Sequence, residues 1–101
     1  MSTAAAGMGD EAFAAFEAQA RADGFDEVLV REWAPGQVLD THTHPFALRV
    51  EVKRGELAFT RDGATCTLRA GDRFELPFEA PHAEAYGPEG ATFWVARRHV
   101  D

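Results

Sequence analysis

The sequence predicts an all-β protein, a small antiparallel barrel or sandwich with one short helix at its N-terminal end. Three observations predict this fold class. Most of the chain alternates apolar and polar residues with a period of two, as strands with one buried face do. These runs are short, and a glycine, proline or aspartate turn signal separates each from the next. The N-terminal part instead repeats its apolar residues at helical spacing.

The N-terminal segment, residues 1–24, is expected to hold a tail and the helix. Residues 1–9 are small and glycine-punctuated, so we expect them to be frayed. A helix is predicted from Asp10, as its N-cap, to about Ala22, with Gly24 ending it. Its phenylalanines at positions 13 and 16 share one face, which we expect to pack on the rest of the same domain.

Residues 25–101 are expected to form the β-barrel. The Arg61-Asp62-Gly63 segment predicts a hairpin turn, and Arg54-Gly55 and Gly87-Pro88 are expected to turn the chain between successive strands. Strands are predicted at residues 28–33, 37–44, 48–53, 56–60, 64–69, 74–76, 83–86 and 91–98.

The length and the charge limit the classes of function. A chain of 101 residues is expected to be one domain. Its net charge of −7 argues against nucleic acid and against anionic membranes, because both require a basic face. One cysteine cannot form an internal disulfide, and we see no leader sequence or long apolar run, so we expect a cytoplasmic protein.

Three histidines are the candidate metal ligands. His42 and His44 lie two positions apart, so on an extended strand they project from the same face. Neutral imidazole is the commonest side-chain ligand of divalent metals. Such a pair also occurs by chance on exposed loops, but His82, in a second segment punctuated by glycine and prolines, supplies a third ligand.

The segment around the histidine pair resembles the first motif of the cupin superfamily. That motif has a glycine, a His-x-His pair, a glutamate and a second glycine at set spacings. Here Gly36, His42, His44 and Gly55 stand at the corresponding positions, but Leu48 occupies the place of the glutamate.

The segment around the third histidine resembles the second cupin motif. Gly71, Pro77 and His82 match that motif, whereas Glu79 replaces its second glycine and Tyr86 its asparagine. The resemblance covers residues 28–98, and it implies a cupin-type double-stranded β-helix that resembles a jelly roll.

The resemblance also implies a function. A cupin with a three-histidine site is expected to bind one divalent transition metal, Fe, Zn, Ni or Mn, with coordination positions left open for a small-molecule substrate. Cupins of this kind include dioxygenases, so a dioxygenase-type oxidoreductase is implied. The alternative is a cupin that binds or senses a small ligand without turnover.

Strand parity sorts the other residues around the histidines. If Leu48 faces the interior, Val50 and Val52 do so too, and Glu51 faces outward. The same count from His82 turns Glu84 and Tyr86 inward. We therefore expect Glu84 and Tyr86 to be the catalytic residues, with Glu84 as a fourth ligand, a general base or a hydrogen-bond acceptor that orients a histidine.

The remaining candidates have structural interpretations. Asp40 is expected to cap backbone N–H groups in a turn. Cys66 is expected to be a small core residue, and His99 to be exposed without a role. The Arg97-Arg98 pair is interpreted as a solvated strand end. The barrel interior or its mouth is expected to be lined by Phe46, Phe74, Phe78 and Trp94.

We also expect a homodimer. The strands predicted at 28–33 and 91–98 are apolar on both faces, as in Phe93-Trp94-Val95. In so small a chain one face covers the core and the other needs its own cover. Either the helix or a second subunit provides it.

Overall fold

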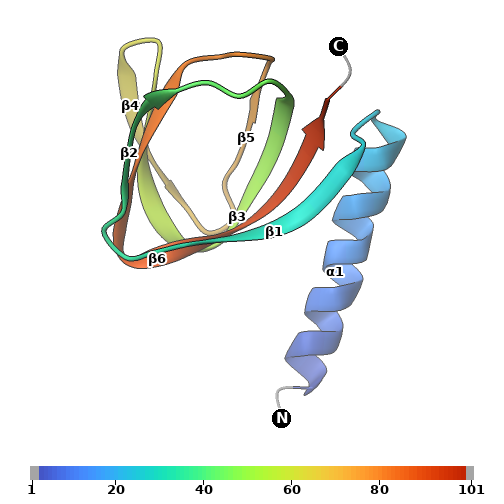
Figure 1. Ribbon diagram of the computed structural model, residues 1–101. Coiled ribbons are helices and arrows are strands. Elements are labelled where there is room, and N and C mark those ends of the chain that lie inside the picture. The colour runs from blue at the N-terminus through green and yellow to red at the C-terminus, as the bar shows by residue number, and fades with distance from the viewer. Residues whose placement is uncertain (1–2, 100–101) are drawn as a thin grey trace.

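The computed structural model describes residues 3–99, with side chains from residue 11 onward. One helix lies beside a strongly curled six-stranded sheet (Figure 1). The elements in chain order are α1 (Thr3–Ala22), β1 (Glu27–Trp33), β2 (Val38–His42), β3 (Ala47–Arg61), β4 (Ala64–Arg69), β5 (Arg73–Leu76) and β6 (His82–Arg98).

All strand pairs in the sheet are antiparallel, and the two long strands organise it. Strands follow the order β1-β6-β3-β4, with β2 paired to β6 and β5 paired to β3. This confirms the predicted all-β fold with one helix. Among residues 3–99, however, no ladder joins β4 back to β1, so the sheet curls without closing into a complete barrel.

The predicted turns at Arg54-Gly55 and Gly87-Pro88 are wrong, because β3 and β6 each continue through them. The β3–β6 register shifts on both sides of Gly55, and four β6 residues, 87–90, bulge between two paired ones. Gly55 has a φ of 80°, and a Cβ added there would lie 2.0 Å from the carbonyl oxygen of Gly90. The glycines therefore allow two backbones to touch where the strands bend.

The main core fills the inside of the curled sheet. Leu48, Val50 and Val52 of β3 are buried there, as strand parity predicts, together with Phe93 and Val95 of β6. These alternate residues face one another across the interior. The apolar positions of β3 and β6 therefore fix which side of the sheet is the inside.

A second core lies between α1 and the outer face of the sheet. Phe13 and Phe16 pack against Trp94, with ring centroids 5.3 and 5.8 Å away. Trp94 therefore does not line the interior as predicted, because its neighbours on β6 take the inward positions. The helix begins at Thr3 and includes Asp10, so the predicted tail and N-cap are wrong for residues 3–9, and residues 1–2 lie outside the described range.

The described residues contain no helix with the length and apolar character needed to cross a membrane.

Candidate metal centre

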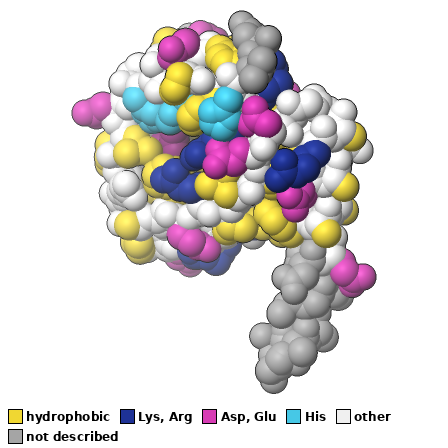
Figure 2. Space-filling model, turned by 45° about the vertical axis from the view of Figure 1, so that its right-hand side comes forward, with side chains coloured by type: hydrophobic (Ala, Val, Ile, Leu, Met, Phe, Trp, Pro, Cys, Tyr) yellow, Lys and Arg dark blue, Asp and Glu magenta, His cyan; other side chains and the backbone are white. Residues whose placement is uncertain are grey.

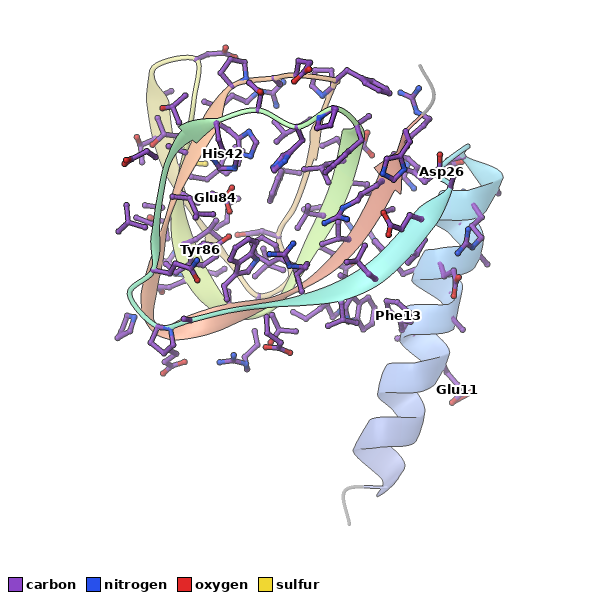
Figure 3. All side chains as sticks on the ribbon, in the orientation of Figure 1. Glu11, Phe13, Asp26, His42, Glu84 and Tyr86 are labelled. Carbon is purple, nitrogen blue, oxygen red and sulfur yellow. The ribbon has the colours of Figure 1, made fainter. Side chains whose placement is uncertain are left out.

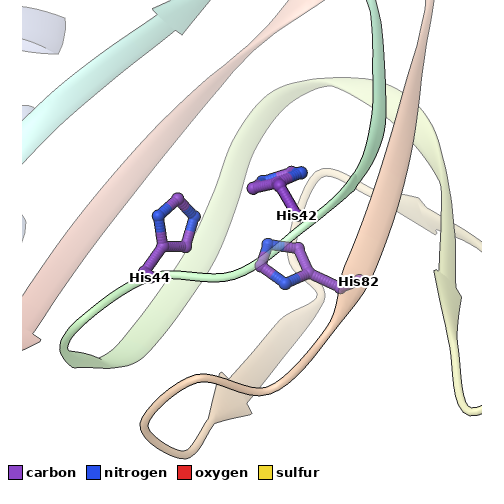
Figure 4. Close-up of side chains that lie close together, drawn as sticks. All are labelled: His42, His44 and His82. Atoms are coloured by element: carbon purple, nitrogen blue, oxygen red, sulfur yellow. The ribbon is translucent and has the colours of Figure 1, made fainter.

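The structure brings the three predicted histidines together at one end of the curled sheet (Figure 4). His42 ends β2 and His82 begins β6, and the two residues are register partners across the β2–β6 ladder. His44 follows in the loop after β2. One ring nitrogen from each histidine can be chosen so that all three lie within 4.8 Å of one another, a spacing that allows them to hold one metal ion.

Backbone carbonyls fix the protonation of two of the rings. The Nδ1 atom of His42 lies 2.7 Å from the carbonyl oxygen of Asp40, and Nδ1 of His82 lies 2.9 Å from that of Ala80. A carbonyl can only accept, so each Nδ1 carries the proton and donates. In the neutral ring the lone pair is then on Nε2, the atom left to bind a metal. Asp40 therefore contributes its carbonyl group to the site.

Glu84 lies against these two ring nitrogens. Its Oε2 is 3.4 Å from Nε2 of His42 and 3.2 Å from Nε2 of His82, and Glu84 is 6% exposed. With both Nδ1 atoms protonated, neutral rings would direct two lone pairs at a carboxylate. That arrangement requires a cation between them, either a proton or a metal ion, so this donor set fits a divalent ion.

The charges of the site are coupled. Burial alone would raise the pKa of Glu84, but His82 and Tyr86 outweigh it and hold this pKa below its ordinary value. Burial lowers the pKa of His82, yet the Glu84 carboxylate raises it overall. At His44 burial prevails and lowers the pKa, which favours the neutral ring that a metal requires.

Tyr86 is buried next to Glu84, on the side away from the histidines. Its hydroxyl donates a hydrogen bond to Oε1 of Glu84, and its ring stacks on Trp33 with centroids 5.0 Å apart. Burial and then Glu84 raise the pKa of Tyr86, so the phenol keeps its proton. Figure 3 shows His42, Glu84 and Tyr86 along the same wall of the barrel. Both predicted catalytic residues thus point inward, as parity indicated.

No carboxylate from β3 joins the histidines. Leu48, at the position of the cupin glutamate, is buried and lines the cavity beside them. Glu51 lies on the opposite face of β3, where it forms ion pairs with Lys53 at 2.8 Å and Arg73 at 2.9 Å. The acidic group nearest the histidines therefore comes from β6 instead of β3.

A cavity of about 50 Å³ opens beside the three histidines. Its walls include Phe46 and Phe74, as predicted, and also Arg31, Trp33 and Arg97, which the sequence interpretation missed. Arg97 is not a solvated strand end, because its Nε is buried. Parity could have found both arginines, because Arg31 alternates with Leu29 and Trp33 on β1, and Arg97 with Phe93 and Val95 on β6.

Three other predictions are corrected. Cys66 is exposed on β4 and is not a core residue. Phe78 does not line the cavity, and its ring lies 5.4 Å from the guanidinium of Arg98. His99 is exposed as predicted but has partners, since its Nδ1 lies 2.7 Å from the carboxylate of Asp26.

Comparison with known proteins gives structural neighbours only. No known protein family matches the sequence, and no curated protein matches it either. Among solved structures, a Rhizobium leguminosarum protein of unknown function is 27% identical with a TM-score of 0.65, over 70% of this chain and 67% of that one. An RmlC-like cupin from Shewanella frigidimarina is 25% identical with a TM-score of 0.61, over 73% and 68%.

The DMSP lyase DddQ from Ruegeria pomeroyi is also similar. It is 25% identical with a TM-score of 0.64, and the match covers 70% of this chain but only 36% of the lyase.

The fold and the histidine cluster define the class of protein: a small β-barrel-like domain with a candidate metal centre at one end. Together with the structural neighbours, they show that the chain has the double-stranded β-helix fold of cupins.

Proposed function

We propose that the protein is a metal-dependent enzyme that acts on a small molecule. His42, His44 and His82 hold one divalent ion, Fe, Zn, Ni or Mn. The observation that carries this proposal is the direction of the ring nitrogens. Two Nε2 atoms, freed by Nδ1–carbonyl hydrogen bonds, meet one buried oxygen of Glu84 at 3.2 and 3.4 Å.

In this proposal Glu84 accepts a proton and Tyr86 orients Glu84. A divalent ion at the site supplies Lewis-acid chemistry, because its charge polarises a bound oxygen or sulfur atom. Oε2 of Glu84 faces the histidines and is placed to accept a proton from a ligand there. The Tyr86 hydroxyl binds the other oxygen, and so holds the carboxylate in this orientation.

Two reaction types suit these residues. The first is oxidation of a small substrate by dioxygen, because cupins with three-histidine sites include dioxygenases and neutral ligands leave the ion its full charge. The second is proton abstraction without oxygen, as in an elimination. The buried Glu84 beside the histidines favours this second type, and one neighbour of similar fold is named as a lyase.

The metal site is tested first. Protein stripped with a chelator is loaded separately with Fe²⁺, Zn²⁺, Ni²⁺ or Mn²⁺, and bound metal is measured after desalting. We expect one ion per chain in the wild type, strong loss in His42→Ala and His82→Ala, and none of this loss in His99→Ala. His99 is the matched control because it lies outside the cluster. Equal metal content in all four proteins would contradict the site.

Catalysis is tested with Glu84→Gln, which keeps the size of the side chain and removes the base. The metal-loaded protein is screened with small thiols and carboxylic acids, with oxygen uptake and product formation measured separately. Turnover should fall by a factor of about 10² to 10⁴ in Glu84→Gln while the metal is retained. Unchanged turnover would exclude Glu84 as the base, and product formed without oxygen uptake would exclude the dioxygenase reaction.

The alternative function is ligand binding without turnover. The apolar part of the cavity wall, with Phe46, Phe74 and Phe93, favours it, because ligand pockets combine apolar walls with a few polar groups. Binding without any product in the same screen would support this alternative. The cytoplasmic location stays a prediction.

A further inference from the structure

Two buried N–H donors lack acceptors in the described part of the chain. They are Nε1 of Trp33 and Nε of Arg97. A buried donor without a partner destabilises the fold, and native proteins satisfy nearly all of them. Both residues line the same cavity, the one beside His42, His44 and His82. The cavity is therefore short of acceptor atoms.

Arg97 is held in place by other groups. Its Nη1 lies 3.3 Å from Oε1 of Glu27, its register partner across β1 and β6, and its guanidinium lies 4.8 Å from the ring of Phe46. The ion pair occupies one edge of the planar guanidinium and leaves Nε free. An arginine held in this way is preorganised for a planar anion, because its N–H groups have a fixed geometry.

Arg31 provides a second positive charge on the same cavity. It stands between Leu29 and Trp33 on the inward-facing side of β1, where an apolar residue is expected. Its guanidinium lies 4.4 Å from the ring of Trp33, and no acceptor among the described residues binds it. Arg31 also lines the neighbouring surface pocket with His42 and His44, so it lies where the cavity meets the surface.

The cavity differs in charge from the protein as a whole. The chain has a net charge of −7, yet two arginines and one acid, Glu84, line this cavity, and a divalent ion would add more positive charge. Figure 2 shows histidine, basic and acidic side chains close together on one face of the barrel. An anion entering here gains the attraction of both arginines in partly desolvated surroundings.

We propose that Arg31, Arg97 and the indole N–H of Trp33 form a carboxylate-binding subsite, so that the ligand of the metal centre is a small carboxylic acid. A cavity of about 50 Å³ is a few times the volume of about 10–15 Å³ that one water molecule requires, so it suits a ligand as small as acetate or propionate. This inference deepens the proposed function by naming the class of substrate. Binding by the arginines, however, does not require the metal.

The test follows the indole N–H signal of Trp33 by NMR while propionate is added. The chain has two tryptophans, so Trp94→Phe assigns the two signals. Propionamide, of the same shape but uncharged, is the matched ligand control, and phosphate is the competing anion. The titrations use metal-free protein and protein loaded with diamagnetic Zn²⁺. We expect the Trp33 signal to move with propionate in both forms, and to move far less with propionamide.

Arginine variants identify the subsite. Arg97→Gln and Arg31→Gln should each weaken propionate binding by about tenfold or more, the usual effect of losing a hydrogen bond to a charged group. Arg97→Lys should recover part of the affinity, because it keeps the charge. Arg69→Gln removes the same charge from an exposed position outside the cavity and should bind as the wild type does.

Each outcome decides one question. Unchanged propionate affinity in folded Arg31→Gln and Arg97→Gln would overturn the subsite, whether or not metal binds. Phosphate binding as tight as propionate binding would overturn the assignment to a carboxylate. Arginine-dependent propionate binding in a protein that takes up no metal would uphold the subsite and contradict the metal centre. If Arg97→Gln fails to fold in a thermal melt, Arg31→Gln and Arg97→Lys decide.

Discussion

The backbone N–H of Glu79 donates a hydrogen bond to the carbonyl oxygen of His44 across 2.9 Å. It joins the loop before β6 to the loop after β2, and these two loops adjoin all three histidines. Glu79 has a φ of 58°, the left-handed conformation that glycine adopts easily. This is the position of a cupin-motif glycine, so the chain keeps that backbone conformation without the residue that suits it.

Glu79→Gly should therefore stabilise the protein. A residue with a side chain in the left-handed conformation costs about 1–2 kcal/mol, which glycine avoids. Part of this stabilisation is lost, because glycine has a larger conformational entropy in the unfolded state. We expect a net gain of about 0.5–1 kcal/mol in the free energy of unfolding, measured by urea denaturation. Glu79→Ala removes the same side chain but keeps the strain, so equal stabilisation in both variants would contradict this explanation.

Gly55→Ala should destabilise the fold by about 3 kcal/mol, because it adds a side chain at positive φ and against the backbone of Gly90. Gly36→Ala is the control. Gly36 also has a positive φ, of 68°, but an added Cβ meets nothing within 4 Å, so the variant should lose only about 1–2 kcal/mol. Thermal melts of both variants measure the difference, and equal losses would mean that close approach has no effect.

Leu48→Glu restores the glutamate of the cupin motif. In the metal-free protein the new carboxylate is buried in the cavity that also contains Glu84, so the variant should melt at a lower temperature. Zn²⁺ should raise its melting temperature more than that of the wild type, because a fourth ligand tightens binding to the folded state. Leu48→Gln is a neutral control, and an equal rise in all three proteins would contradict a metal beside Leu48.

Stability should depend on pH through Glu51. Burial raises the pKa of this carboxyl, but Lys53 and Arg73 outweigh it, so its folded-state pKa lies below the ordinary value. A depressed pKa gives stability that is present above the unfolded pKa and lost as pH falls through the folded one. Glu51→Gln should thus be less stable than the wild type at pH 7, and this difference should shrink as the pH falls below the unfolded-state pKa of the carboxyl. A difference that persists undiminished at pH 3 would have another cause.

The homodimer stays a prediction, and only two exposed valines now support it. Helix α1 covers Trp94 on the outer face of β6, whereas Val30 and Val38 remain 47% and 65% exposed. Light scattering at micromolar concentration should give twice the mass of the chain. Val30→Glu should then shift the protein towards monomer, and Asp62→Lys, an exposed change in the turn between β3 and β4, is the control. A wild-type mass of one chain would leave the helix as the only cover.

Local patterns predicted the parts of the site that depend on strand parity. Alternation placed Leu48 inward and Glu51 outward, and the same count from His82 placed Glu84 inside. The sequence could not distinguish the bend at Gly55 from a turn, because a glycine with positive φ is suited to either. Only the contact of Gly55 with the backbone of Gly90, which is distant in sequence, shows that the strand continues.

The arginines of the cavity were missed although strand parity could have placed both of them inside. Arg97 and Arg98 were interpreted together as an exposed basic pair. Adjacent residues of a strand point to opposite faces, however, and counting from the buried Phe93 and Val95 places Arg97 inside. Trp94 was assigned to the interior because this strand is apolar on both faces. The helix that covers its outer face is distant in sequence.

In the proposed metal centre, the hydrogen bonds of His42 and His82 to carbonyls two residues earlier would affect which ion is bound. Each ring is oriented by a backbone carbonyl, that of Asp40 in β2 or that of Ala80 in the loop before β6. Both rings therefore hold their orientation without an ion, and binding one would require little ordering. An imidazole set of this kind binds several first-row ions, in the order of their intrinsic affinities. Selection among Fe, Zn, Ni and Mn would then depend on the supply of each ion in the cell, so we expect the metal content of the purified protein to follow the medium in which it was produced.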